Sequence, residues 1–129
     1  MTNPFMNRAA KRSSTDHGRK SEKRVAASLA ARLTPASGAM RGAKSDMKKK
    51  VGDHKFQIES KATKTATLAV DLGWLVKVTE EAQATGSIPA LTMSFVGEDG
   101  KSRPKGDWVA VPLWFFQQVL EELEAGNVA

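Results

Sequence analysis

The 129-residue sequence contains no cysteine and no long hydrophobic segment. Without cysteine the chain can form neither disulfides nor thiolate metal sites, which fits a reducing compartment. The longest apolar stretches, such as VAVPLWFF, are too short to span a bilayer, and the polar, basic N-terminus shows no signal peptide. We therefore expect a soluble, cytoplasmic protein.

Size and hydrophobic content indicate one compact domain. The chain is 40% hydrophobic, and a chain of this length can bury roughly two-thirds of its unfolded surface. Residues 1–17 are small, polar or basic and show no hydrophobic periodicity. We expect a flexible basic arm over residues 1–17 and a single folded domain over residues 18–129.

Charge is distributed unevenly along the chain. Residues 1–64 contain 16 Lys and Arg against 5 Asp and Glu, whereas residues 65–129 contain 4 against 9. This asymmetry is typical of a protein with one face that binds a polyanion. The basic excess continues well beyond residue 20, which favours nucleic acid as the partner over a solvated basic tail without one.

Hydrophobic periodicity predicts an α/β fold. A helix is expected from Ser21, a strand hairpin around Gly52-Asp53, a helix from Asp71 to Gly86, strands at 88–96 and 108–112 separated by a polar loop, and a last helix after Pro112. The expected inner stripes are Leu72, Leu75, Val76, Thr79 and Ala82 in the middle helix and Leu113, Phe116, Leu120 and Leu123 in the last. A central mixed sheet with helices on both faces buries all of these stripes.

The segment FQIESKAT, residues 56–63, has the alternation of a half-buried strand. Its period of two places Glu59 and Lys61 on the same face. The two side chains form either a solvated ion pair or part of an active site.

The hairpin places a second acid near Glu59. Asp46 and Glu59 are equally far from the turn, so they are expected to be cross-strand neighbours on one face. Two carboxylates so close need a counter-charge, which Lys61 and a hard divalent cation such as Mg²⁺ can supply. A shift of one residue in the register would place the two acids on opposite faces.

Glu22 is the third candidate acid. It lies three and seven residues before Val25 and Leu29, on the inward stripe of the first helix. It is either a first-turn glutamate favoured by the helix dipole or a member of the same acidic site.

These residues resemble a known motif. Asp46, thirteen positions before the Glu59 of IESK, resembles the PD-(D/E)xK nuclease motif, with Ser45 where the motif has proline. With Glu22, the Ser37-Gly38 pair and the order of elements, residues 18 to about 115 look most like archaeal and phage-type Holliday-junction resolvases of that superfamily.

The resemblance implies a fold and a function. The fold would be a restriction-endonuclease-like core, the nuclease domain being residues 18–129. The activity would be that of a Mg²⁺-dependent endonuclease, with Mn²⁺ as a substitute, that makes paired nicks in four-way DNA junctions as a homodimer. A phage-encoded enzyme would act in the host cytoplasm.

The resemblance also implies roles for individual residues. The catalytic residues would be Glu22, Asp46, Glu59 and Lys61. The metal would be held by Asp46, Glu59, the main-chain carbonyl of Ser60 and, through water, Glu22. Lys61 would orient or deprotonate the attacking water. The expected DNA contacts are Arg19, Lys20, Ser37, Arg41, Lys44, Lys48, Lys50 and Lys64.

Two other functions remain open from the residues. One is a nuclease of the same fold that acts on replication forks or other DNA structures. The other is a non-catalytic basic DNA-binding protein, in which Glu59 and Lys61 are only an ion pair. The last helix carries aromatic residues on more than one side, which indicates a dimer contact.

Overall fold

The structure is a computed structural model that describes residues 19–33 and 47–126. Its elements are a helix over residues 19–29, β1 (Arg32–Leu33), β2 (Met47–Val51), β3 (His54–Thr63), α2 (Leu72–Ala84), β4 (Ile88–Val96), β5 (Ser102–Ala110) and α3 (Leu113–Glu124). Four parts of the sequence-based prediction lie outside the described residues: the basic arm, the Ser37-Gly38 pair with Arg41 and Lys44, Ser45, and Asp46. None of the described helices is long and apolar enough to cross a membrane.

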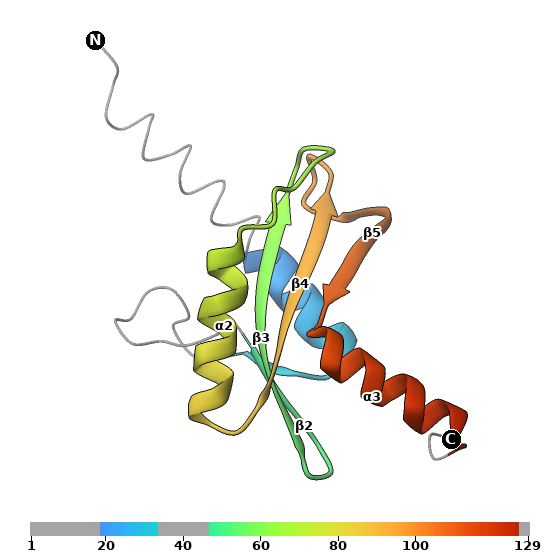
Figure 1. Ribbon diagram of the computed structural model, residues 1–129. Helices are drawn as coiled ribbons and strands as arrows, with labels where there is room; N and C mark the ends of the chain where they lie inside the picture. The colour runs from blue at the N-terminus through green and yellow to red at the C-terminus, as the bar shows by residue number, and fades with distance from the viewer. Residues whose placement is uncertain (1–18, 34–46, 127–129) are drawn as a thin grey trace.

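The five strands form one mixed sheet in the order β1-β2-β3-β4-β5 (Figure 1). β3 and β4 are parallel and the other neighbouring pairs are antiparallel. A parallel pair requires a crossover connection, and α2 provides it between β3 and β4. The α/β class and the mixed sheet agree with the sequence-based prediction.

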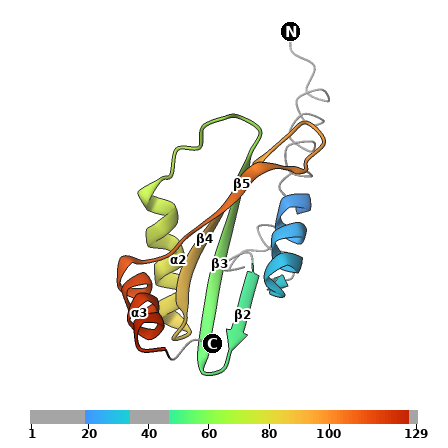
Figure 2. The same cartoon turned by 90° about the vertical axis from the view of Figure 1, so that its right-hand side faces the viewer.

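Helices cover both faces of the sheet, as predicted. The helix of residues 19–29 packs on one face and α2 on the other (Figure 2). Val25 and Ala26 from this first helix share a core cluster with Met47, Ile58 and Ala90. On the opposite face, Val78 and Ala82 of α2 are buried, and so is Leu91 of β4.

The hairpin has the register that the turn at Gly52-Asp53 predicted. Met47 pairs with Ile58, and the pairing continues without a shift to Val51 and His54. Gly52 has φ +59, a left-handed conformation that glycine adopts without steric cost. The expected pairing of position 46 with Glu59 falls one residue beyond the last described pair.

The predicted inner face of α2 was partly wrong. Asp71 caps the helix as expected, because its side chain accepts a 2.7 Å hydrogen bond from the Gly73 amide. However, the helix turns Val78 and Ala82 toward the sheet, while Leu72 and Val76 are 72% and 45% exposed. α2 packs against β3 and β4, and this packing buries a different side of the helix from the one that was predicted.

The segment predicted as a polar loop before residue 108 is largely strand β5. β5 begins at Ser102 and ends at Ala110. It is an edge strand with mostly exposed residues, so its side chains need not be apolar. Pro104 lies in the irregular stretch between the paired residues Ser102 and Asp107, and proline is tolerated at such bulges of edge strands.

The predicted inner face of α3 was wrong. The helix starts after Pro112 as expected, but none of its residues is buried. Leu113, Phe116, Leu120 and Leu123 are all exposed. The helix instead contacts the rest of the chain through Phe115, whose ring meets that of Phe56 edge-on at 5.6 Å.

Candidate functional site

The candidate site is centred on Glu59, a buried carboxylate in the middle of β3. Its side chain is only 9% exposed. Lys61 Nζ lies 3.5 Å from Glu59 Oε1, and Lys77 Nζ of α2 lies 3.9 Å from the same oxygen. Burial of a carboxylate is costly without compensating charge. The two ammonium groups supply that charge from two different elements.

Lys61 is held in place by an aromatic ring as well as by Glu59. Its ammonium lies 4.7 Å from the centre of the Trp74 ring, within the range of a cation–π interaction. Its side chain is 31% exposed. The Glu59–Lys61 pair is therefore an ion pair that α2 partly encloses, with Glu59 buried and Lys61 half-exposed.

Sequence reasoning missed the contribution of α2 to this cluster. Trp74, Lys77 and Glu81 follow one another at spacings of three and four, so they lie on one side of the helix. Lys77 lies between Glu59 and Glu81, because its Nζ is also 4.0 Å from Glu81 Oε1. The helical spacing of these residues was visible in the sequence, but not which strand they face.

Glu22 lies in a different layer from Glu59. The side chain of Glu59 points toward α2, whereas the half-buried Glu22 belongs to the helix on the other face of the sheet (Figure 2). Glu22 is one helical turn before Ala26, which shares the core cluster with Met47 at the start of β2.

The structure describes three members of the expected metal-binding set, Glu22, Glu59 and Ser60. Glu59 and the nearly buried Ser60 are consecutive residues of β3. Within residues 19–33 and 47–126, no three His, Asp or Glu side chains gather closely enough to hold a metal ion. The expected set also requires Asp46, which is outside these ranges.

An ion pair fastens the first helix to the far edge of the sheet. Two guanidinium nitrogens of Arg24 donate hydrogen bonds of 2.6 and 2.8 Å to the Asp107 carboxylate of β5. This hydrogen bonding holds the pKa of Asp107 below its ordinary value. The pair, which sequence reasoning did not find, fixes the position of the helix that carries Glu22.

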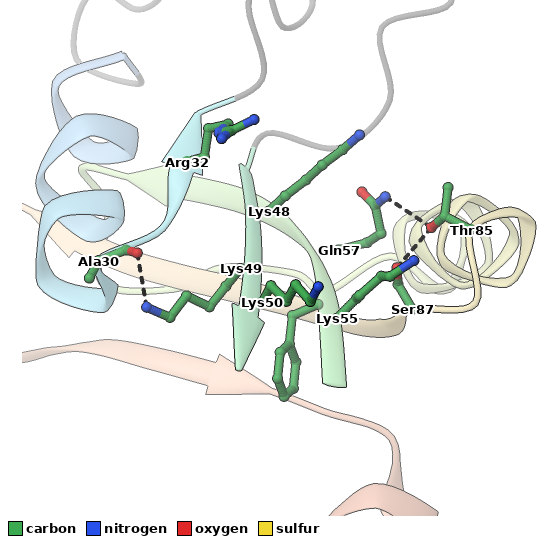
Figure 3. Close-up of a pocket in the computed structure, with 10 residues that line it drawn as sticks. Ala30, Arg32, Lys48, Lys49, Lys50, Lys55, Gln57, Thr85 and Ser87 are labelled. Carbon is green, nitrogen blue, oxygen red and sulfur yellow. Dashed lines mark hydrogen bonds between the residues drawn. The ribbon is translucent and has the colours of Figure 1, made fainter. Parts of the chain in front are cut away.

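A basic hollow of about 610 Å³ lies beside the hairpin (Figure 3). Its lining contains no acidic side chain and five basic residues: Arg32, Lys48, Lys49, Lys50 and Lys55. Lys50 and Lys55 are directly opposite each other in the hairpin. Like charges at paired positions repel, so an anion between them would stabilise this arrangement.

The floor of the hollow is polar. Gln57 is 3% exposed, and its amide nitrogen donates a 3.2 Å hydrogen bond to the Thr85 hydroxyl (Figure 3). The Thr85 and Ser87 hydroxyls are 2.8 Å apart. Lys55, Gln57 and Glu59 alternate along β3, so the hollow and the candidate site share one face of the sheet.

The described DNA-contact candidates do not form a single patch. Lys48 and Lys50 line the hollow, whereas the ammonium of Lys49 turns to the first helix and donates to the Ala30 carbonyl at 3.0 Å. Arg19 and Lys20 are exposed at the start of the first helix. Lys64 follows the far end of β3, where its carbonyl accepts a 2.7 Å hydrogen bond from Arg103.

The expected contacts omitted three basic residues of the hollow, Arg32, Lys49 and Lys55. The hairpin register could have identified Lys55, because it pairs with Lys50. Arg32 comes from β1, whose pairing with Lys48 had no clear signal in the sequence.

A scan against protein-family models and a search of curated proteins found no match to this chain. Function is therefore inferred from the chemistry of the site.

Proposed function

We propose that the chain is a metal-dependent endonuclease with a restriction-endonuclease-like core, which cuts phosphodiester bonds in branched DNA as a resolvase of four-way junctions. The observation that carries the proposal is the buried Glu59 of the central strand, with the half-buried Lys61 3.5 Å away and α2 beside both. The element order also supports it: a helix with an early glutamate, a hairpin, a crossover helix and further strands.

The proposal requires Mg²⁺ at this site. Glu59 would supply one carboxylate ligand of the kind that Mg²⁺ prefers, although Lys61 and Lys77 already provide counter-charge to it. In the proposal Asp46, Glu59 and the Ser60 carbonyl hold the ion; Glu22 belongs to the helix on the other face of the sheet and is given no role in holding it. When bound, the ion would lower the pKa of a water molecule and neutralise charge on the phosphate.

Lys61 would act on the substrate from the same side. Its ammonium is held between Glu59 and the Trp74 ring, so it is positioned before DNA arrives. A fixed cation stabilises negative charge that develops on the phosphate, and it can orient the attacking water. Lys77, 3.9 Å from Glu59, would keep that carboxylate in place.

The basic hollow would bind the DNA backbone next to the cut. Lys48, Lys50 and Lys55 carry charges for which no acidic partner is present among the residues that line it. Contacts to phosphates position a duplex without reading its sequence. A short chain of this kind would therefore select DNA by its shape, and two matched nicks would require two copies of the chain.

Non-catalytic DNA binding is the second candidate function. The hollow favours it independently, because its five basic residues would attract DNA whether or not Glu59 takes part in chemistry. Both candidate functions involve binding of DNA, and only the nuclease would cut it.

Nicking of a synthetic four-way junction separates these functions. With Mg²⁺ we expect nicks in the junction and little cutting of linear duplex or of a fork. Asp46→Asn and Glu59→Gln should abolish nicking and retain junction affinity, whereas Glu80→Gln, at an exposed glutamate of α2, should nick normally. If every DNA stays intact with Mg²⁺ and with Mn²⁺, the nuclease proposal is wrong and non-catalytic binding replaces it. Preferred cutting of forks would retain the chemistry and change the substrate.

A further inference from the structure

The outer face of α3 is an apolar surface without a cover in the described chain. Leu113, Phe116, Leu120 and Leu123 are 71%, 50%, 43% and 52% exposed. Trp114, on a different side of the helix, is also 54% exposed. A surface helix normally turns such a stripe toward its own core. In α3 the stripe faces outward.

The spacing of this stripe is that of a helix–helix seam. The four residues follow at intervals of three, four and three, the pattern of the a and d positions of a heptad. A helix of 12 residues is only marginally stable in water without packing. α3 extends away from the sheet at the hairpin end of the molecule (Figures 1 and 2) and is anchored through Phe115. A second helix packed on the seam would supply the packing that α3 lacks.

The charges of α3 favour an antiparallel copy of itself. Its last turn has no basic residue, and its first turn has no acidic one. Glu121, Glu122 and Glu124 lie near its C-terminal end, where the helix dipole disfavours negative charge. In an antiparallel pair these carboxylates lie beside the positive N-terminal end of the other helix.

We propose that α3 forms a homodimer interface, in which the α3 helices of two copies pack antiparallel around a two-fold axis. Full overlap of the seam places Phe116 against the partner's Leu120 and Leu113 against the partner's Leu123. This proposal rests on the proposed function for its purpose, since a second copy provides the second cutting site. Its support and its test involve no DNA.

Sedimentation analysis of the full chain at micromolar concentrations tests the interface. We expect wild type to sediment as a two-copy species and Leu120→Glu as a single copy, with a dimer dissociation constant weaker by about 30-fold or more. Leu72→Glu is the matched control, because Leu72 is an equally apolar, exposed residue of α2. Circular dichroism identifies variants that do not fold. A monomeric wild type, or a folded Leu120→Glu that remains dimeric, would overturn the proposal.

Disulfide formation tests the orientation without a disruptive charge. The chain has no cysteine, so each introduced thiol is unique. Phe116→Cys mixed with Leu120→Cys should form a disulfide-linked pair under mild oxidation, and neither variant alone should do so as readily. Leu72→Cys should not cross-link with either. Preferential linkage of Phe116→Cys to itself would indicate a parallel pair and contradict the antiparallel arrangement.

The two proposals can fail separately. A monomer that nicks DNA would refute the interface and leave the nuclease intact. A dimer that forms through α3 but never cuts DNA would support the interface and refute the nuclease proposal.

Discussion

At the scale of single residues, the candidate site depends on a core neighbour as much as on its charged groups. Leu91 of β4 pairs with Glu59 of β3, so the two side chains share the face that α2 covers. Leu91 is fully buried. It fills the space beside a carboxylate that is only 9% exposed and helps to keep water away from it.

Leu91→Ala should lower the free energy of unfolding by about 2–5 kcal/mol, because the truncated side chain leaves a cavity in a packed interior. Urea unfolding followed by circular dichroism measures this change. Leu72→Ala removes the same atoms at a site that is 72% exposed, and it should change the stability by less than about 0.5 kcal/mol. Equal losses of stability in the two variants would mean that β4 and α2 do not form a packed layer.

At the scale of elements, the hairpin β2–β3 unites the candidate site with the basic hollow. Lys55 and Glu59 are on the same face of β3, separated by four residues. At about 3.3 Å per residue, the two positions are roughly 13 Å apart. In the proposed nuclease, a DNA strand cut near Glu59 would therefore pass the hollow within a few nucleotides.

Lys55→Glu should weaken junction binding several-fold at low salt, because it replaces an attraction to phosphate with repulsion. The plot of log affinity against log salt concentration should become shallower by about 0.9 for each phosphate that the variant no longer neutralises. Fluorescence anisotropy titrations at several salt concentrations measure both effects. Lys101→Glu makes the same charge change at an exposed site outside the hollow and serves as the control. Identical salt slopes for the two variants would exclude the hollow as the binding site.

The elements also show how far the sequence predicted this structure. The hairpin register followed from Gly52-Asp53 and the alternation of residues 54–61, since both signals are local. The same-face placement of Glu59 and Lys61 followed from the period of a strand.

By contrast, an apolar stripe such as that of α3 indicates that a face is to be covered and does not identify the cover. The positions of Trp74 and Lys77 depend on how α2 docks, which is a tertiary property. The first part of β5, residues 102–107, was predicted as a loop, and only residues 108–110 were predicted as strand, because an exposed edge strand needs little apolar character.

At the scale of the whole molecule, the Arg24–Asp107 pair joins the first described helix to the last strand. Both side chains are partly exposed, so the pair contributes modestly to stability. Its contribution depends on pH, because the pKa of Asp107 is lowered, chiefly by its hydrogen bonding to Arg24.

Since the folded state lowers this pKa, the pair stabilises the protein above the ordinary carboxyl pKa, and the contribution disappears as pH falls through the folded-state value. Below about pH 4, the melting temperature of wild type should therefore fall more steeply than that of Asp107→Asn. Thermal unfolding from neutral to acidic pH measures both slopes. Asp53→Asn, at an exposed aspartate of the hairpin turn, should follow wild type. If Asp107→Asn follows it too, the pair has no role in acid stability.

The parallel pairing of β3 and β4 has a consequence for the order of folding. A hairpin closes a short loop, whereas the β3–β4 pair forms only after the chain from residue 64 to residue 87 has closed around α2. We therefore expect the strand that carries Glu59 to form early and the docking of Trp74 and Lys77 to follow. Under the proposed function, a nascent chain would lack a complete candidate site until this last cooperative step, and cutting of DNA would begin only once the fold is complete.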